Sequence, residues 1–297
     1  MDFEEFTEKM LELLRKRVGD DWEASVYKTL KNNGIKRTGI MLAKKGERYG
    51  SILYLEEAYE KYRDGMDEEE AVDVLLDAPF GHDFEVEFDK KFQAESFRDY
   101  SQVKEHLRLR LINYGKNTEL LEDVPHVRWN DLAIIFCYEI GAWKEGDAYI
   151  MIRNDHFAGW EETVEALYED ALKNMRNEAP DDMFSLNDMF MKEKAPDREK
   201  IPPMYVLTNA SRKFGAAVML YSGKIKELAD SIGSDLVILP SSLHEVLLLA
   251  DDEDAHPRWK EMVGEVNRLM VDPEEVLSDN IYRYSREKDA IELVAAG

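Results

Sequence analysis

The sequence predicts an α+β protein in which antiparallel strand pairs are covered by amphipathic helices, in two or three closely packed units. Three observations lead to this fold class. Apolar residues recur at helical spacing in several long segments, an Asn-Gly dipeptide separates two strand-like segments, and short runs of branched apolar residues are bounded by Pro, Ser or Asn. Helical spacing predicts amphipathic helices, whereas short apolar runs between turn residues predict strands.

Residues 1–78 are expected to form an N-terminal α+β unit. Apolar side chains at helical spacing predict a first helix over 3–18. Asn33-Gly34 lies between candidate strands 23–31 and 35–43 and is a strong hairpin signal. Two further helices should follow, the first ending near Gly65 and the second capped by Asp67.

Residues 79–95 lack a clear period and mix Pro, Gly and charge, so we expect a linker there. Residues 97–175 are expected to form a central helix–hairpin–helix unit. Its predicted elements are a helix over 97–113, a short helix near 117–121, strands 132–138 and 148–152, and a helix over 160–175.

Residues 176–202 are rich in polar residues and prolines and are the best candidate for a domain boundary. Residues 203–297 are expected to form a C-terminal α+β unit. Its predicted elements are strands 204–208, 215–221, 235–239 and 245–249, helices 223–232 and 257–270, and a terminal hairpin at 280–294.

Composition limits the function. The chain has 297 residues, a net charge of −24 and one cysteine, Cys137. Such an acidic protein is repelled by phosphate backbones, so direct nucleic-acid binding is not expected. No apolar run reaches the length of a membrane span and no secretory signal opens the chain, so we expect a cytoplasmic protein without membrane contact. The charge fits a solubilising surface, or alternatively an inhibitor that mimics nucleic acid.

A polar turn between two strongly apolar strand candidates is the first candidate site. It contains Ser241, Ser242, His244 and Glu245 after Pro240. Ser242 and His244 alternate along an extended chain and so could share a face, as a nucleophile and its base require. The chain has no Gly-x-Ser-x-Gly elbow, and the Ser hydroxyls could instead cap backbone groups of the turn.

A second set of polar residues flanks the predicted hairpin of strands 132–138 and 148–152. His126 and Arg128 precede the first strand, and Asn154 and His156 follow the second. Pairing of these strands would bring the four residues to one sheet end, where His244 could join them. Asn209, at the end of strand 204–208, is a further binding candidate. Cys137 lies in mid-strand and is expected to be a buried, inert thiol.

No metal site and no cofactor are predicted. The histidines do not have the spacing of known zinc motifs, and the chain has neither a phosphate-binding loop nor a dinucleotide-binding glycine motif. The partner is expected to be an unidentified protein or small molecule.

Several motifs together resemble the domain-of-unknown-function family 5688 of gut anaerobes, over nearly the whole chain. They include Val124-Pro125-His126-x-Arg128, Ile152-Arg153-Asn154-x-His156, Met204-Tyr205-Val206-Leu207-Thr208-Asn209, Phe214-Gly215-Ala216-Ala217, Leu239-Pro240-Ser241-Ser242-x-His244-Glu245 and Pro273-Glu274-Glu275-Val276. The middle helix region is also loosely similar to the domain-of-unknown-function family 1444. The resemblance implies an intracellular bacterial protein and assigns no activity or site residue.

Three functional hypotheses remain open. The first is a non-enzymatic module that binds a protein or a small ligand at the polar sheet end. The second is a hydrolase that uses Ser242, His244 and His126, with Asn154 or Arg128 holding an oxyanion. The third is the acidic inhibitor.

Overall fold

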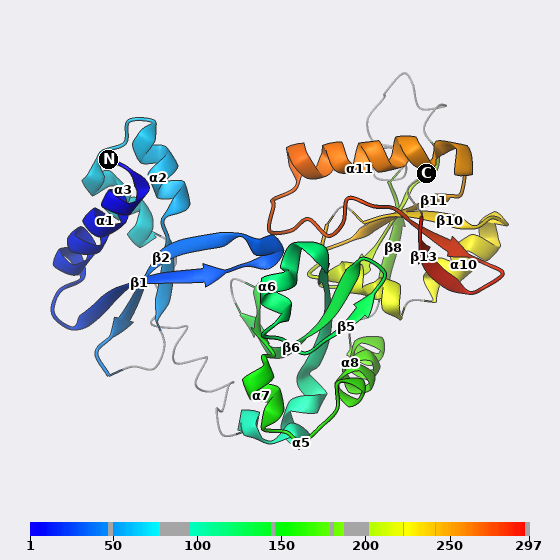
Figure 1. Ribbon diagram of the computed structural model, residues 1–297, viewed down its shortest axis with the longest axis horizontal. Helices are drawn as coiled ribbons and strands as arrows, with labels where there is room; N and C mark the ends of the chain where they lie inside the picture. The colour runs from blue at the N-terminus through cyan, green and yellow to red at the C-terminus, as the bar shows by residue number, and fades with distance from the viewer. Residues whose placement is uncertain are drawn as a thin grey trace. The chain divides into compact units, whose positions relative to one another are not determined.

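The computed structural model describes residues 1–46, 50–77, 96–143, 146–178, 181–186, 202–221, 223–240 and 242–294. The linker predicted at 79–95 lies outside these ranges. Helices and antiparallel sheets make up the described chain, which confirms the α+β fold class (Figure 1). The chain divides into two compact units. Unit 1 comprises residues 1–31 and 35–93, and unit 2 comprises residues 32–34 and 94–297.

The described residues of unit 1 form a three-stranded antiparallel sheet and three helices. Its strands β1 (Trp22–Leu30), β2 (Lys36–Lys44) and β3 (Ser51–Tyr54) lie side by side in chain order. Helix α1 (Phe3–Val18) begins at a capping box between Asp2 and Glu5. Its buried face, which includes Phe6 and Met10, packs in one core with apolar side chains of β2 and of helices α2 (Glu56–Arg63) and α3 (Glu68–Asp77).

The predicted helices and hairpin of unit 1 are confirmed. Asp67 caps α3 by accepting a hydrogen bond from the Glu70 amide at 2.8 Å. Strand β3 was not predicted, because its four residues are too short a segment to show a period before α2 begins.

The described residues of unit 2 form two antiparallel sheets. In the first, the long central strand β6 (Leu132–Trp143) pairs with β4 (Leu107–Asn113) along one edge. Strand β5 (His126–Trp129) pairs with the first part of β6, and β7 (Gly146–Met151) pairs with its second part, so the predicted hairpin between β6 and β7 is confirmed. The short helix α6 (Thr118–Leu121) connects β4 to β5, whereas α5 (Tyr100–Val103) precedes β4 and α7 (Asn154–Ala158) follows β7.

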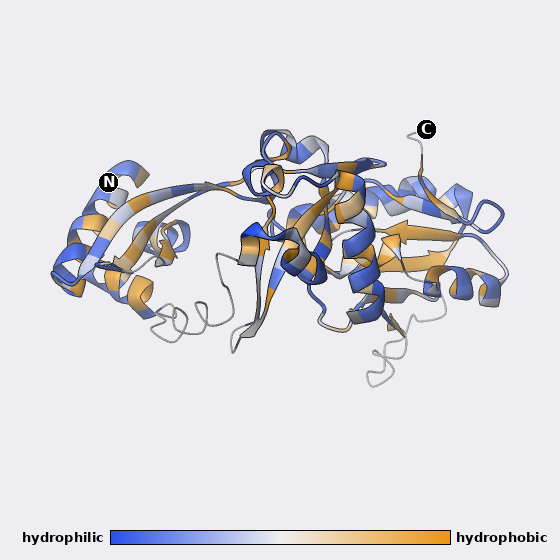
Figure 2. Cartoon of the chain, turned by 90° about the horizontal axis from the view of Figure 1, so that it is seen from below, coloured by the Kyte–Doolittle hydropathy of each residue, from blue (hydrophilic) through white to orange (hydrophobic). Residues whose placement is uncertain are grey.

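The second sheet has six strands in the order β13-β12-β10-β11-β9-β8. These strands are β8 (Asp181–Ser185), β9 (Tyr205–Asn209), β10 (Leu236–Leu239), β11 (Val246–Ala250), β12 (Tyr282–Ser285) and β13 (Ala290–Leu293). In Figure 2 the strands of this sheet are largely orange, because many of their residues are hydrophobic.

Both faces of the six-stranded sheet are covered. Successive strand residues point to opposite faces, so Val237 and Leu239 of β10 pack against Trp259 of helix α11 (His256–Met270). Leu236 and Ile238 point to the other face and join the main core, to which helices α8 (Val164–Glu178) and α10 (Lys224–Ile232) contribute. A strand that is buried on both faces consists of consecutive apolar residues. This explains why β10 was predicted correctly from the sequence.

Two predicted elements are wrong. The segment 97–113 is not one helix: α5 and a 3-10 turn (Lys104–His106) lead into strand β4. Val103, Leu107 and Leu111 have helical spacing, but Leu107, Leu109 and Leu111 also alternate with Arg108 and Arg110. Hydrogen bonding to β6 therefore selects the strand.

The segment 215–221 is not a strand but the 3-10 helix η6 (Gly215–Leu220). Its first residues, Gly215, Ala216 and Ala217, are small and buried. Such residues allow a close approach of the backbone to its neighbours, which an apolar pattern in the sequence does not reveal.

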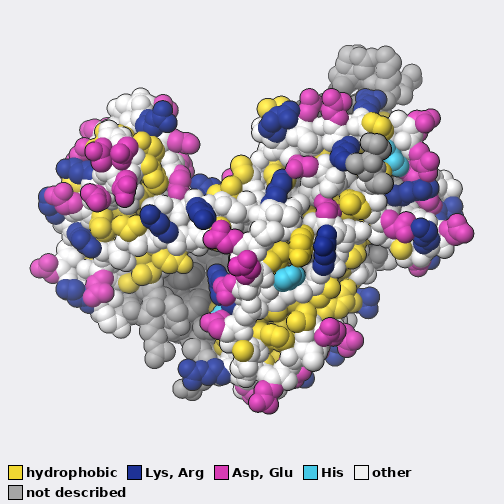
Figure 3. Space-filling view, viewed as in Figure 1, with side chains coloured by type: hydrophobic (Ala, Val, Ile, Leu, Met, Phe, Trp, Pro, Cys, Tyr) yellow, Lys and Arg dark blue, Asp and Glu magenta, His cyan; other side chains and the backbone are white. Residues whose placement is uncertain are grey.

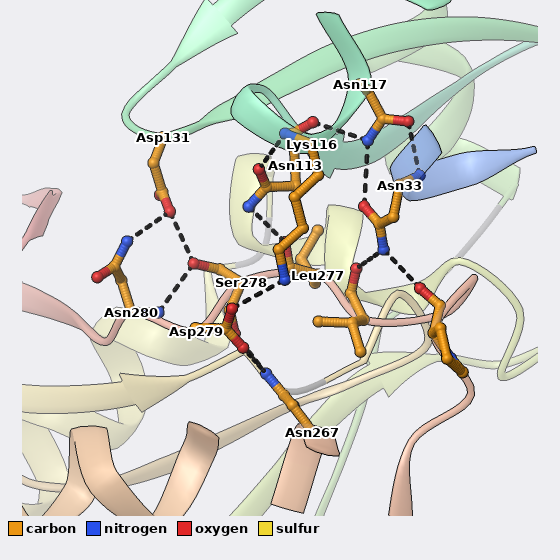
Figure 4. Close-up of polar contacts among 12 residues, drawn as sticks. Asn33, Asn113, Lys116, Asn117, Asp131, Asn267, Leu277, Ser278, Asp279 and Asn280 are labelled. Atoms are coloured by element: carbon orange, nitrogen blue, oxygen red, sulfur yellow. Dashed lines mark hydrogen bonds and ion pairs between the residues drawn. The ribbon is translucent and has the colours of Figure 1, made fainter. Parts of the chain in front are cut away.

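Polar side chains fix the segment 273–282 to the rest of unit 2 (Figure 4). The Asp131 carboxylate, at the turn between β5 and β6, accepts hydrogen bonds from Ser278 Oγ at 2.7 Å, from Asn280 Nδ2 at 2.9 Å and from the Tyr282 hydroxyl. Trp129 stacks on the Tyr282 ring with centroids 5.9 Å apart. Asp131 thereby connects the two sheets of unit 2, because Tyr282 belongs to β12.

Asparagines continue this network. Asn33, in the turn 32–34 that belongs to unit 2, donates to the carbonyls of Pro273 and Val276 at 2.8 and 2.7 Å. Asn117 binds Asn33 through its amide oxygen and nitrogen, and Asn113 Nδ2 donates to the Leu277 carbonyl at 3.1 Å (Figure 4). These bonds satisfy carbonyl groups of residues 273–277, which belong to no helix or strand.

None of the helices in the described ranges is both long and apolar enough to span a bilayer.

Replacing Asp131 by Ala should lower the free energy of unfolding by about 2–4 kcal/mol, because three side-chain donors lose a charged acceptor. Chemical denaturation measures the change. Asp155→Ala is the matched control, since that carboxylate is largely exposed and should change stability by less than about 0.5 kcal/mol. Equal effects of the two substitutions would contradict the central role of Asp131.

Candidate functional site

A cavity of about 190 Å³ lies in unit 2 between the first sheet and the loop that follows β9. Strands β4, β6 and β7 contribute to its wall, and the loop 209–214 covers it. The lining side chains that carry chemistry are Arg108, Arg110, Cys137, Glu139, Tyr149, Asn209, Ser211 and Lys213.

Strand register places the two arginines on the cavity. Arg108 is opposite Cys137 and Arg110 is opposite Ile135 in the β4–β6 ladder. Residues two apart share a face of a strand, so Arg108 and Arg110 lie on one face of β4. Leu107, Leu109 and Leu111 contribute to the buried core, and Leu109 also lines the cavity.

Asn209 shapes the loop that covers the cavity. Its buried side chain donates from Nδ2 to the Lys213 carbonyl at 2.9 Å. Its Oδ1 accepts from Ser211 Oγ at 3.1 Å and from the Lys213 amide at 3.2 Å. Arg212 and Phe214 have φ angles of 56° and 51°. Non-glycine residues rarely adopt this left-handed conformation, so the side-chain bonds of Asn209 hold the loop in a strained shape.

Phe214 connects the loop to the arginines. The Arg110 guanidinium carbon lies 4.0 Å from the centroid of the Phe214 ring, which is a cation–π contact. Tyr149 meets the same ring edge-on with centroids 5.6 Å apart, and the His244 ring stacks on it at 5.7 Å. His244 Nδ1 also accepts a hydrogen bond from the Phe214 amide at 3.3 Å. His244 therefore supports Phe214 from outside the set of lining residues.

The residue after Phe214 must be glycine. Thr208 Oγ1 donates to the His244 carbonyl at 2.6 Å, and Gly215 packs against this bond. A Cβ atom at Gly215 would lie 2.1 Å from Thr208 Oγ1 and 2.3 Å from the His244 oxygen. This close packing fixes the end of the loop beside β9, where the chain enters η6, and thus the position of Phe214 over Arg110.

The cavity has an excess of positive charge. Arg108 is paired with Glu139 at 2.5 Å, and the Tyr149 hydroxyl donates to the same carboxylate at 3.5 Å. Arg110 Nε is buried and has no hydrogen-bond partner among the described residues. Burial lowers the pKa of the Arg110 guanidinium, but arginine stays protonated at neutral pH because its ordinary pKa is so high. Lys213 adds a third cation.

Burial raises the pKa of the Cys137 thiol to about 11, although the nearby Arg110 charge acts in the opposite direction. The expectation of a buried thiol is thus confirmed, and at neutral pH the thiol is protonated.

The Ser242 hydroxyl and the ring nitrogens of His244 contact other groups rather than each other. Ser242 Oγ accepts a hydrogen bond from the His244 amide at 3.0 Å. The His244 imidazole contacts the Phe214 amide through Nδ1 and lies 3.3 Å from Glu275 Oε1 through Nε2. Glu245 is half-buried ahead of β11, and Ser241 lies outside the described residues. The Ser242 hydroxyl thus bonds to the backbone of its own turn, at the His244 amide.

The other predicted site residues lie on β5 and α7. His126 Nδ1 lies 3.0 Å from the Val124 carbonyl, and Arg128 stacks on the Tyr114 ring at 4.5 Å. Asn154 donates to the Glu122 carbonyl at 2.9 Å, and His156 packs edge-on against Phe97. No hydrogen bond, ion pair or ring contact in the described chain joins any two of His126, His156 and His244.

No group of three or more His, Cys, Asp or Glu side chains in the described ranges is arranged to hold a metal ion.

Of the residues predicted from sequence, Asn209 and His244 thus belong to the cavity or its support. Arg108 and Arg110 were missed, because a helix over 97–113 would turn them to different sides. The strict alternation of Leu and Arg over 107–111 was the signal that could have revealed both the strand and its cationic face.

Replacing Gly215 by Ala should destabilise the protein by at least about 2 kcal/mol, because the new Cβ would overlap Thr208 and the His244 backbone. Gly264→Ala is the matched control. A Cβ there has open space within helix α11, so we expect about 0.5–1 kcal/mol of added stability. Urea unfolding of both variants checks the prediction, and a neutral Gly215→Ala would contradict the tight packing.

Alkylation of Cys137 by iodoacetamide should be slow at neutral pH and rise about tenfold per pH unit up to its pKa of about 11, because only the thiolate reacts. Cys137 is the only cysteine, so mass spectrometry reports on it directly. The denaturant-unfolded chain is the control, with a thiol pKa of about 8.5. If native and unfolded protein showed the same pH profile, the enclosure of the thiol would be refuted.

Comparison with known proteins gives one relationship. The model of a family of unknown function, DUF5688, matches residues 3–286. No curated protein and no solved structure matches the chain. Because the match covers nearly the whole sequence, including every residue of the cavity described above, the chain belongs to the DUF5688 family of unknown function.

Proposed function

We propose that this protein is a binding module that takes a small molecule into the cavity beneath the loop 209–214. The observation that carries the proposal is the combination of a 190 Å³ cavity with converging polar groups and a loop held in a strained conformation by Asn209. Ligand sites are typically concave, formed before binding, and supplied with a few placed polar groups. Strained loops also concentrate at such sites.

The contacts give less support to the other two hypotheses. A hydrolase would need the His244 imidazole to reach Ser242 Oγ, but the ring nitrogens lie against Phe214 and Glu275. A nucleic-acid mimic would need a continuous acidic stripe. On the face shown in Figure 3, the Asp and Glu side chains are interspersed with Lys, Arg and hydrophobic side chains.

Ala210 provides a test, because it is exposed and lines the cavity. Ala210→Trp should fill the cavity mouth without disturbing the core. A library of anionic and neutral metabolites is first screened by thermal shift on the wild-type protein, and each compound that binds is then titrated by calorimetry. We expect binding to the Ala210→Trp variant to weaken by at least about tenfold, because the indole occupies the ligand's space.

Ala158→Trp is the matched control, since Ala158 is also exposed but lies on α7 and does not line the cavity. It should retain wild-type affinity. Equal binding to both tryptophan variants would place the ligand elsewhere and refute the proposal. Protection of Cys137 from alkylation by the same ligands provides an independent measurement, because this thiol lines the cavity.

A further inference from the structure

The cavity is cationic in a protein that is strongly acidic. Arg108, Arg110 and Lys213 line it, and Glu139 is the only carboxylate among its described lining residues, although the chain as a whole carries a net charge of −24. Arg108 and Glu139 neutralise each other at 2.5 Å. Two positive charges, on Arg110 and Lys213, are therefore left on the cavity wall.

Arg110 is the more informative of the two. Its side chain is half-buried, and its enclosed Nε has no acceptor among the residues that the structure describes. Removing a guanidinium from water without a hydrogen-bonding anion is unfavourable, so buried arginines are ordinarily paired. An unpaired one beside a cavity is the arrangement expected when the paired anion belongs to a ligand.

The charged groups around Arg110 do not provide the anion that would pair with it. Glu274 and Glu275 act on it through space, and Glu275 lies against His244. The Cys137 thiol is protonated at neutral pH and carries no charge. Glu139, the carboxylate on the cavity wall, pairs with Arg108.

Phe214 determines which part of the guanidinium a ligand can use. The centroid of the ring lies 4.0 Å from the guanidinium carbon, so the ring occupies one side of the group. The N–H donors of arginine lie in its plane and point outward from its edge, where they match the two oxygens of a carboxylate or phosphate. Because Asn209 and the left-handed Phe214 backbone hold the ring in place, the guanidinium is already oriented before a ligand binds.

We propose that the cavity recognises an oxyanion, the carboxylate or phosphate group of a small ligand, and that Arg110 is the residue that holds it, with Lys213 as a second cation. This inference rests on the proposed function, since it names the chemical class of ligand that the same cavity takes. The positive charge of Arg110 and the unpartnered Nε among the described residues make this residue the determinant of specificity for anions over neutral molecules.

The test uses inorganic phosphate and succinate as probes on the full-length protein. Each is titrated by calorimetry and by thermal shift, with sodium chloride at equal ionic strength as the reference. We expect at least one probe to raise the melting temperature beyond the chloride reference. Phosphate alone would indicate a phosphorylated ligand, and succinate alone would indicate a carboxylate.

Arg110→Met should abolish this response, and Arg110→Lys, which keeps the charge but not the planar donor edge, should weaken binding by about tenfold. Arg258→Met is the matched control. Arg258 is another arginine that lies over an aromatic ring, Trp259, but it belongs to α11 and does not line the cavity. It should respond to the probes like the wild-type protein.

Removal of Arg110 should leave the ligand-free protein at least as stable as the wild type, because an unpaired enclosed charge is lost. Should Arg110→Met fail to fold, protection of wild-type Cys137 by the probes replaces the variant as the measurement. Absence of any response of the wild-type protein to both anions, or an unchanged response in Arg110→Met, would overturn the proposal. If neutral compounds still bound to the wild-type protein and Ala210→Trp blocked their binding, the proposed function would nevertheless be supported.

Discussion

The Asp131 carboxylate is the interaction on which unit 2 depends. It accepts hydrogen bonds from Ser278, Asn280 and Tyr282 and so joins the turn between β5 and β6 to the strand β12 of the other sheet. A charged acceptor with several donors is stronger than isolated neutral bonds, and its geometry is demanding. It therefore fixes how the two sheets of this unit meet, and the cavity lies between elements of those same two sheets.

The loop and the arginine at the cavity are in energetically unfavourable states, and the stability of the surrounding core compensates for them. Two non-glycine residues of the covering loop have left-handed backbone angles, and the enclosed Arg110 guanidinium finds no acceptor for its Nε within the described ranges. Each of these features is costly in isolation. The extensive apolar core, to which both sheets and helices α8 and α10 contribute, makes such local strain tolerable. Features of this kind are typical of sites that are formed for binding rather than for stability.

The sequence located part of this site. The polar turn at Ser242 and His244 was recognised because reactive side chains between two apolar strands are unusual, and Asn209 was recognised at the end of β9. The roles of these residues were not predicted from the sequence. Asn209 forms hydrogen bonds within its own loop, and His244 supports Phe214. The two cavity arginines were missed with strand β4. Their spacing is uninformative until the segment is known to be extended, because a helix and a strand present alternate residues differently.

The sequence by itself determined the α+β class, the hairpin around Asn33-Gly34, most helices and the apolar strands of the six-stranded sheet. Those features follow from local periodicity, turn chemistry and caps, which act between residues close in the chain. Tertiary structure alone decided that 107–113 is a strand and that 215–220 is a 3-10 helix. Leu107 and Leu111 satisfy both periods, so only the hydrogen bonds to β6, a partner distant in sequence, could select one. That selection turned Arg108 and Arg110 to a common face and thereby created the cationic wall of the cavity.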